Sequence, residues 1–203
     1  MIKNFFCAGL TSFLMVLSFA VFVSAQTEPS ENFPDIKIKN FGQMDERFYR
    51  GAQPEEDDYP ALKALGIETV IDLRNDPTDY EKAAVEALGM KYVNIQISGW
   101  KYPKAEQIEE FLKLVNDPSI GAFYVHCHAG KHRVGIAGAV YRFTKYGWGY
   151  EQVYKEMKNY EFSSWMVHGR LKTFVKDYAK KMEAEKSQSL IFQDAANAMG
   201  SGQ

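Results

Sequence analysis

The feature that most constrains the fold is a regular alternation of strand-like and helix-like segments between residues 67 and 146. The strand-like runs are apolar and β-branched, and they are 67–74, 90–97 and 121–127. Between the last two, residues 104–116 carry apolar side chains at i, i+3, i+4 and i+7, which predicts a helix with one buried face. This alternation predicts an α/β fold: a single layered domain with a central, mostly parallel sheet flanked by helices.

Further elements are predicted on both sides of this alternating region. Short strands are expected at Ile36–Phe41 and Arg47–Pro54, and Thr78 or Asp79 is expected to cap the helix after the strand at 67–74. The other predicted helices are 134–146, which is rich in Gly and Ala, 150–160 and 167–186. We therefore expect a folded domain at 35–186 and a weakly structured tail at 187–203.

The first 25 residues differ from the rest of the chain. They contain one early cation, Lys3, then an apolar run without acidic residues, and they end in Val23-Ser24-Ala25. This pattern is typical of a signal peptide cleaved after Ala25, so we expect an exported protein, periplasmic or secreted, with residues 26–34 as a short tether. The alternative is an uncleaved membrane anchor, because a run of this length could span a bilayer.

Charge and cysteine content exclude several classes of protein. A formal net charge of −2 argues against a general nucleic-acid or anionic-membrane binder. The chain has 2 cysteines, and Cys7 lies in the leader, so Cys127 is alone in the exported domain and cannot form an intramolecular disulfide there. Cys127 is therefore either a buried apolar residue or a nucleophile.

The residues around Cys127 favour the nucleophile. In YVHCHAGKHRVG, a buried strand ends at Cys127, a turn contains Gly130, and Arg133 begins a helix. Loop amides and a helix N-terminus attract an anion, and the fork of an arginine can bind two phosphate oxygens. The same positive field favours the thiolate, which would then be a nucleophile aimed at phosphorus.

This stretch resembles the Cys-x5-Arg loop of the cysteine-based tyrosine and dual-specificity phosphatases. Its His-Cys-x-x-Gly-Lys-His-Arg core and the upstream FYRGAQP and LKALGIETVIDLR segments are most similar to compact, atypical plant-and-fungal-type and bacterial members. Some of these are linked to inositol pyrophosphates. The resemblance implies a layered phosphatase domain and a phosphoric ester hydrolase that works through phosphocysteine, with no cofactor and no metal.

Roles carry over only onto matching positions. The resemblance implies that Cys127 is the nucleophile, that Arg133 binds the phosphoryl oxygens, and that His126 helps to fix the loop and to ionise the thiol. Backbone amides of the loop would face the phosphate, and they belong to His128, Ala129, Gly130, Lys131, His132 and Arg133.

Two positions depart from the family pattern. Val134 stands where the family usually has Ser or Thr, whose hydroxyl assists hydrolysis of the phosphoenzyme. The loop at 98–103 lacks the usual aspartate general acid, which leaves Asp76 as the first candidate and Asp79 as the second. A positioned acid contributes about 10²–10⁴-fold, most for poor leaving groups. The departure therefore favours phosphoanhydride or aryl phosphate substrates over phosphoserine and phosphothreonine.

Other charged and aromatic residues have two interpretations each. The side chains of His128, Lys131 and His132 either form a cationic floor suited to an inositol polyphosphate or point to solvent. Trp100, Lys101 and Tyr102 form either a substrate rim or an ordinary surface loop. Arg50 and Arg74 are expected to be structural ion-pair partners, and His168 is assigned no special role.

The expected partner of the phosphatase is a phosphorylated small molecule or phosphoprotein. Three other interpretations of the sequence remain. A catalytically weak or inactive pseudo-phosphatase would bind phosphorylated ligands, and Val134 and the absent aspartate support it. A metal site at His126, Cys127, His128 and His132 is opposed by the adjacent Arg133 and by the difficulty of converging neighbouring side chains on one ion. A sulfur transferase or arsenate reductase is opposed by the lack of a second, resolving cysteine in the exported domain.

Overall fold

A computed structural model describes residues 33–165 and 168–200. Its centre is a five-stranded sheet in the order β1-β2-β5-β3-β4. The strands are β1 (Gly42–Gln43), β2 (Phe48–Gly51), β3 (Ile67–Asp72), β4 (Lys91–Asn94) and β5 (Ala122–His126). Only the pairing of β1 with β2 is antiparallel, so the prediction of a mostly parallel sheet is confirmed.

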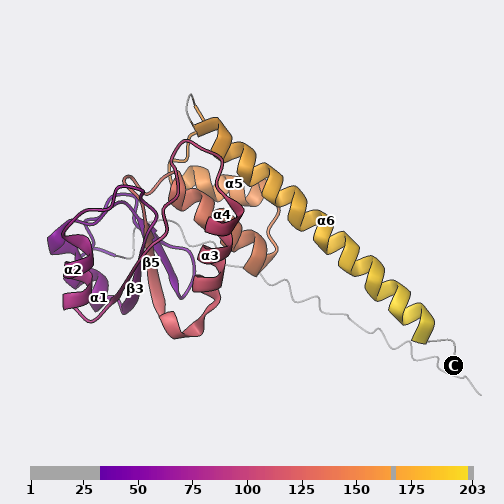
Figure 1. Ribbon diagram of the computed structural model, residues 1–203, viewed down its shortest axis with the longest axis horizontal. Helices are drawn as coiled ribbons and strands as arrows, with labels where there is room; N and C mark the ends of the chain where they lie inside the picture. The colour runs from indigo at the N-terminus through magenta and orange to yellow at the C-terminus, as the bar shows by residue number, and fades with distance from the viewer. Residues whose placement is uncertain (1–32, 166–167, 201–203) are drawn as a thin grey trace, which may run out of the picture.

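Helices cover both faces of this sheet. They are α1 (Tyr59–Ala64), α2 (Glu81–Ala87), α3 (Ala105–Asn116), α4 (Arg133–Tyr146), α5 (Tyr150–Asn159) and α6 (Gly169–Gly200), with short 3-10 turns at Glu56–Asp58 and Pro118–Ile120. In Figure 1, α1 and α2 lie on one side of the strands, and α3, α4, α5 and α6 lie on the other. The sheet therefore has a small apolar core on its α1/α2 side and a larger one on its α3/α4 side.

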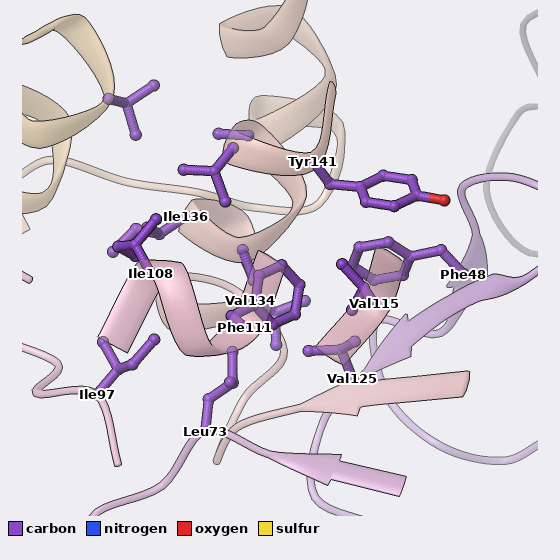
Figure 2. Packing of buried hydrophobic residues seen from close by; sticks show 14 of the residues in the cluster. Phe48, Leu73, Ile97, Ile108, Phe111, Val115, Val125, Val134, Ile136 and Tyr141 are labelled. Atoms are coloured by element: carbon purple, nitrogen blue, oxygen red, sulfur yellow. The ribbon is translucent and has the colours of Figure 1, made fainter. Parts of the chain in front are cut away.

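The larger core holds α4 directly against the sheet. Figure 2 shows Phe111 and Val115 from α3, Val134 from α4 and Val125 from β5 packed together. Close packing of α4 depends on its small residues: a Cβ added at Gly138 would lie 2.9 Å from the Met44 side chain. The tight packing expected from the Gly- and Ala-rich sequence is confirmed, and it fixes the N-terminus of α4 at the end of β5.

The first predicted strand is wrong. Residues Ile36–Phe41 are irregular, with a turn at residues 39–40, although their alternation is strand-like. Asn40 has a positive φ of 55°, and its side-chain amide donates to the carbonyls of Gly130 and Tyr160. These distant hydrogen bonds favour a turn over a ladder.

Two further boundaries differ from prediction. α2 begins at Glu81 after a turn at Asp79–Tyr80, so neither Thr78 nor Asp79 is its cap. α6 continues to Gly200, so residues 187–200, predicted to be weakly structured, are helical. The predicted leader at 1–25 lies outside the described residues. Within the described part of the chain, none of the helices combines the length and apolar character needed to cross a membrane.

Candidate active site

The candidate site lies where the parallel strands β2, β3 and β5 end. Cys127 directly follows β5, and Arg133 is the first residue of α4, so residues 127–132 form a short loop between strand and helix. The segments after β2 and β3 reach the same edge, because parallel strands share their carboxyl ends there. The strand–loop–helix arrangement predicted around Cys127 is confirmed.

Gly130 is required by the shape of this loop. Its φ is +67°, and a Cβ at this position would lie 2.5 Å from the carbonyl carbon of Gly51. Both the left-handed backbone and the contact with β2 exclude a side chain. The turn assigned to Gly130 from sequence is therefore present and closely packed.

Hydrogen bonds orient the peptide groups of the loop. The carbonyl of His128 accepts a hydrogen bond from the backbone N–H of Gln53 at 3.3 Å. The carbonyl of Gly130 accepts from Arg50 Nη2 at 2.7 Å and from Asn40 Nδ2 at 2.9 Å. In a trans peptide the next N–H points opposite to the carbonyl. The amides that follow these carbonyls therefore point away from β2, and together with the N-terminus of α4 they suit an anion.

Cys127 and Arg133 lie at the two ends of the loop. Cys127 is 3% exposed and packs in the larger core. The side chain of Arg133 is 13% exposed, with Nη1 3.3 Å from Asn75 Oδ1 and 3.5 Å from the Leu73 carbonyl. The segment after β3 thus holds the guanidinium beside the loop, as a phosphate ligand requires.

Asp76, the first candidate for general acid, lies beside Arg133. Its Oδ1 is 4.0 Å from Arg133 Nη1, and its side chain is 68% exposed. Slight desolvation raises the pKa of Asp76, but the neighbouring Arg74 and Arg133 outweigh this and leave its pKa below the usual value. A general acid must hold a proton at working pH, so this environment opposes the acid role in the free enzyme. The side chain of Asp79 has no hydrogen bond or ion pair among the described residues.

His126 lies beneath the loop in a buried polar network. Its Nε2 is 2.8 Å from Glu81 Oε1 in α2, and its Nδ1 is 3.9 Å from Asp72 Oδ1 at the end of β3. Glu81 also accepts hydrogen bonds from Tyr59 and Gln53. The side chains of Asp72, Glu81 and His126 are all fully buried. The histidine is therefore held between two carboxylates, as a residue that fixes the loop should be.

The two carboxyl groups of this network have opposite pKa shifts. Burial raises the pKa of Asp72, and this exceeds the opposing effect of His126. Burial also raises the pKa of Glu81, but contacts with His126, Gln53 and Tyr59 outweigh it and lower the pKa overall. Of the two carboxyl groups, Glu81 is therefore the one that ionises more readily.

The same three groups are the one cluster among the described residues that could hold a metal ion, with ligand atoms within 4.8 Å of one another. Their oxygens already accept hydrogen bonds from Tyr59, Gln53 and Tyr92. The carboxylate oxygens are thus already engaged, whereas both ring nitrogens of His126 are buried and make no hydrogen bond of good geometry among the described residues. Glu81 carries no local sequence signal of this role, because an acidic residue in a first helical turn is common.

Of the two interpretations of the loop side chains, a cationic floor or exposure to solvent, the floor is not formed by Lys131 or His132. Lys131 Nζ lies 2.7 Å from Glu161 Oε2. The ring of His132 stacks on His168 at 3.5 Å between centroids, and desolvation together with His168 lowers the pKa of His132 to about 4. His132 is therefore neutral at pH 7, while His128 is exposed.

The loop at 98–103 lies beside the site. A Cβ at Gly99 would lie 3.9 Å from Arg133 Nε, and Trp100, 62% exposed, stacks on the ring of His168. His168 Nδ1 lies 3.0 Å from the Gly99 carbonyl. His168, assigned no role from sequence, therefore joins this loop to the ring of His132 in the Cys127 loop. Tyr102, also exposed, contacts Asp177 of α6.

The arginines predicted to form structural ion pairs differ from each other. The Arg74 side chain contacts Gln53 and Asp76, while its backbone amide, not its guanidinium, binds Asp72. Arg50 is fully buried and has no carboxylate within ion-pair distance among the described residues. The prediction of an ion pair at Arg50 is therefore wrong.

A sheet that ends in a buried cysteine, an anion-binding turn and an arginine at a helix N-terminus is the arrangement that a cysteine-based phosphatase requires. The family described as "DSP-PTPase phosphatase fused to NAD+ Kinase" matches residues 23–189, and the chain belongs to this family. The predicted membership of the dual-specificity phosphatase superfamily is confirmed.

Individual relatives agree with this assignment. Inositol diphosphatase DSP2 of Oryza sativa subsp. japonica is 27% identical over 128 residues, 60% of this chain and 61% of that protein. Dual specificity protein phosphatase TpbA of Pseudomonas aeruginosa is 24% identical over 119 residues, 59% of this chain and 53% of that protein. The chain thus spans less than two thirds of either relative.

A solved structure shares the fold. The catalytic domain of the PP-IP phosphatase SIW14 from S. cerevisiae has a TM-score of 0.64 at 19% identity, covering 76% of this chain and 94% of that one. The prediction of a dual-specificity phosphatase-like fold is therefore confirmed. The chain is a cysteine-dependent phosphatase, a hydrolase of the tyrosine and dual-specificity type.

Proposed function

We propose that this phosphatase acts on phosphoanhydrides and aryl phosphates, with inositol pyrophosphates and phosphotyrosine as its two candidate substrate classes. The Cys127 thiolate attacks phosphorus and forms an S–P bond while the bond to the leaving oxygen breaks. Water then hydrolyses phosphocysteine to inorganic phosphate. Arg133 and the loop amides stabilise the charge on the phosphoryl oxygens in both steps.

The observation that carries the substrate proposal is the environment of Asp76. Its lowered pKa favours the carboxylate, and the loop at 98–103 offers no acid of its own. An alkoxide leaving group needs a proton from such an acid, whereas a phosphate or phenolate is a weaker base and needs less help. The inositol diphosphatase and the PP-IP phosphatase among the similar proteins support the anhydride class.

The test is phosphate release by the full chain, with a chelator present and Cys127→Ser as the control. Substrates would be p-nitrophenyl phosphate, phosphotyrosine and phosphoserine peptides, phytate and an inositol pyrophosphate. We expect kcat/KM on the phosphoserine peptide to be lower by about 10²-fold or more than on the best anhydride or aryl substrate. Equal rates on all of them would contradict the substrate proposal.

A second candidate, a phosphate-binding pseudo-phosphatase, is favoured by Val134. This side chain is fully buried in the larger core and offers no hydroxyl near the phosphoenzyme. Trapping the intermediate with a ³²P-labelled substrate separates the two candidates. A phosphocysteine that forms and then decays supports the enzyme. Binding of the labelled substrate without any covalent label supports the binding module.

We also propose that the domain works outside the cytoplasm, because residues 1–25 have the pattern of a signal peptide. Expression of the full chain followed by cell fractionation and N-terminal sequencing tests this. A protein that begins at Gln26 in the exported fraction supports it, and an uncleaved, membrane-bound chain supports the anchor.

A further inference from the structure

Arg50, in β2, is a buried cation in neutral surroundings. It is 1% exposed, and its Nη2 donates to the Gly130 carbonyl at 2.7 Å. Its guanidinium carbon lies 3.8 Å from the centroid of the Tyr160 ring. Its Nε is buried and has no hydrogen-bond partner among the described residues. These contacts are to a dipole and an aromatic ring, neither of which neutralises a full charge.

Arg142 in α4 shows what this fold does with another buried arginine. Its Nη2 lies 2.6 Å from Glu156 Oε1, and its Nε contacts both oxygens of that carboxylate. Such pairing is the rule, since a buried charge without a counter-charge costs several kcal/mol. Glu156 also attracts Arg50. Its carboxylate is already bound by Arg142, so Arg50 needs another anion.

The groups that face Arg50 leave one such anion. Burial lowers the pKa of Arg50 to about 10, which keeps it protonated at pH 7. Burial raises the pKa values of Tyr124 and Tyr160, so both phenols are neutral there. Cys127 is the nearby candidate. It lies two residues after Val125, the register partner of Arg50 on β5, and both side chains lie on the α4 side of the sheet, where Cys127 attracts Arg50.

We propose that Arg50 is a positioning residue that acts as the buried counter-cation of the Cys127 thiolate, and then of the phosphate bound by the loop. The second part rests on the proposed function, while the first concerns the thiol alone. The proposal explains why β2 carries an arginine without a carboxylate beneath an anion-binding loop. It assigns activation of the nucleophile partly to the interior, where salt screens charges little.

The test is the pH dependence of Cys127 alkylation by iodoacetamide in the full chain. Peptide mass spectrometry distinguishes Cys127 from Cys7. In Arg50→Gln, which keeps a donor but loses the charge, we expect the midpoint of alkylation to rise by about 1 pH unit. The rate at about pH 6 should then fall about tenfold. Arg50→Lys keeps the charge, so its alkylation midpoint should stay close to the wild-type value.

Asn40→Gly is the matched control for loop positioning. It removes the other side-chain donor to the Gly130 carbonyl, together with its bond to the Tyr160 carbonyl, without removing a charge, and its φ of 55° suits glycine. Its alkylation midpoint should stay at the wild-type value. An unchanged midpoint in Arg50→Gln, or an equal rise in Asn40→Gly, would overturn the proposal.

A salt series on the wild type provides a test that does not depend on folding of the variants. Between about 0.05 and about 1 M salt, a thiolate stabilised by buried Arg50 should keep its midpoint within about 0.3 pH unit. A rise toward about 8.5 at high salt would assign the effect to exposed cations and overturn the proposal. Alkylation needs no turnover, so these results stand even if the chain hydrolyses no substrate.

The phosphate part has its own measurement. Inorganic phosphate should protect Cys127 from alkylation, and the concentration that gives half-protection should be about tenfold higher in Arg50→Gln than in wild type. Equal protection of the two proteins would overturn the role of Arg50 in phosphate binding. Its role toward the Cys127 thiolate would then be decided by the pH dependence of alkylation alone.

Discussion

The two sides of the Cys127 loop are built differently. On the interior side, Arg50, His126 and Glu81 are fully buried and held by several other elements of the fold. On the outer side, Trp100 and His128 are exposed, and among the described residues Lys131 is held only by a surface ion pair with Glu161. Under the proposals above, activation of Cys127 is tied to folding, while substrate choice rests on side chains that packing constrains little.

Gly130→Ala should have the largest effect, because it forces the loop away from its interior support. The new Cβ would lie 2.5 Å from the Gly51 carbonyl carbon, at a φ of +67°. A shift of about 1 Å in a catalytic loop can cost about 10²-fold, so we expect kcat/KM to fall at least that much. Steady-state kinetics on p-nitrophenyl phosphate measures it.

Gly147→Ala is the matched control. Gly147 also has a positive φ, +62°, but a Cβ there meets nothing within 4 Å. The strain alone should lower the free energy of unfolding by about 1–2 kcal/mol and leave kcat/KM within about twofold of wild type. Equal losses of activity in the two variants would show that backbone strain, not loop position, is responsible.

Glu81→Gln should have an intermediate effect on the interior side. It removes the carboxylate that lies 2.8 Å from His126 Nε2. We expect the free energy of unfolding to fall by about 1–3 kcal/mol, and kcat/KM to fall about tenfold as the loop loses a fixed support. Chemical denaturation and kinetics measure the two quantities on the same preparation.

Tyr59→Phe controls for the loss of a hydrogen bond to Glu81. It removes the donor 2.9 Å from Glu81 Oε1 but keeps the charge. It should cost about 1 kcal/mol of stability with little change in kcat/KM. If the phenylalanine variant loses as much activity as Glu81→Gln, the carboxylate has no separate role.

The pH dependence of Glu81 has a defined sign. Its folded-state pKa is lowered, so the stability it contributes is present above the unfolded value of about 4.5 and is lost as pH falls through the folded value. The difference in unfolding free energy between wild type and Glu81→Gln should shrink below about pH 4. A constant difference down to pH 3 would contradict this.

His132, at the boundary between the two sides, should give a smaller effect that depends on pH. Its folded-state pKa is about 4, lowered by desolvation and by His168. Between about pH 6.5 and pH 4 the unfolded chain binds the additional proton, so wild-type stability should fall as pH decreases. In His132→Gln this part of the slope should disappear, as denaturation at several pH values would show. Identical slopes of stability against pH in wild type and His132→Gln would contradict the lowered pKa of His132.

Much of the fold could be predicted because its signals are local. The alternation of β3, α3, β5 and α4 is recorded in apolar periodicity within each segment, and the loop from Cys127 to Arg133 is contiguous. Ile36–Phe41 was misassigned because its alternation is outweighed by hydrogen bonds from Asn40 to residues 90 and 120 positions away. Local periodicity cannot reveal such partners.

On the interior side, the sequence indicates His126 but not the contacts of Arg50 and Glu81, for the same reason. Arg50 and its acceptor Gly130 are 80 positions apart. Glu81 and His168 likewise reach their partners only after the chain has folded. Roles that depend on one residue type at one loop position could be read from the sequence. Roles that depend on which elements meet beneath the loop needed the structure.

Lys131→Ala should have the smallest effect and sharpens the comparison on the outer side. Because Lys131 Nζ binds Glu161 at the surface, its loss should change the free energy of unfolding by less than about 1 kcal/mol. It should also change kcat/KM on p-nitrophenyl phosphate by less than about twofold.

An inositol pyrophosphate carries more negative charge, and it can draw the ammonium of Lys131 away from Glu161, since an exposed ion pair is weak. In that case KM for this substrate alone would rise in Lys131→Ala, and Glu161→Ala would lower it by releasing the lysine. Unchanged KM values for both substrates in both variants would show that Lys131 takes no part in substrate choice, which would then depend on Arg133, the loop amides and the exposed aromatic side chain of Trp100.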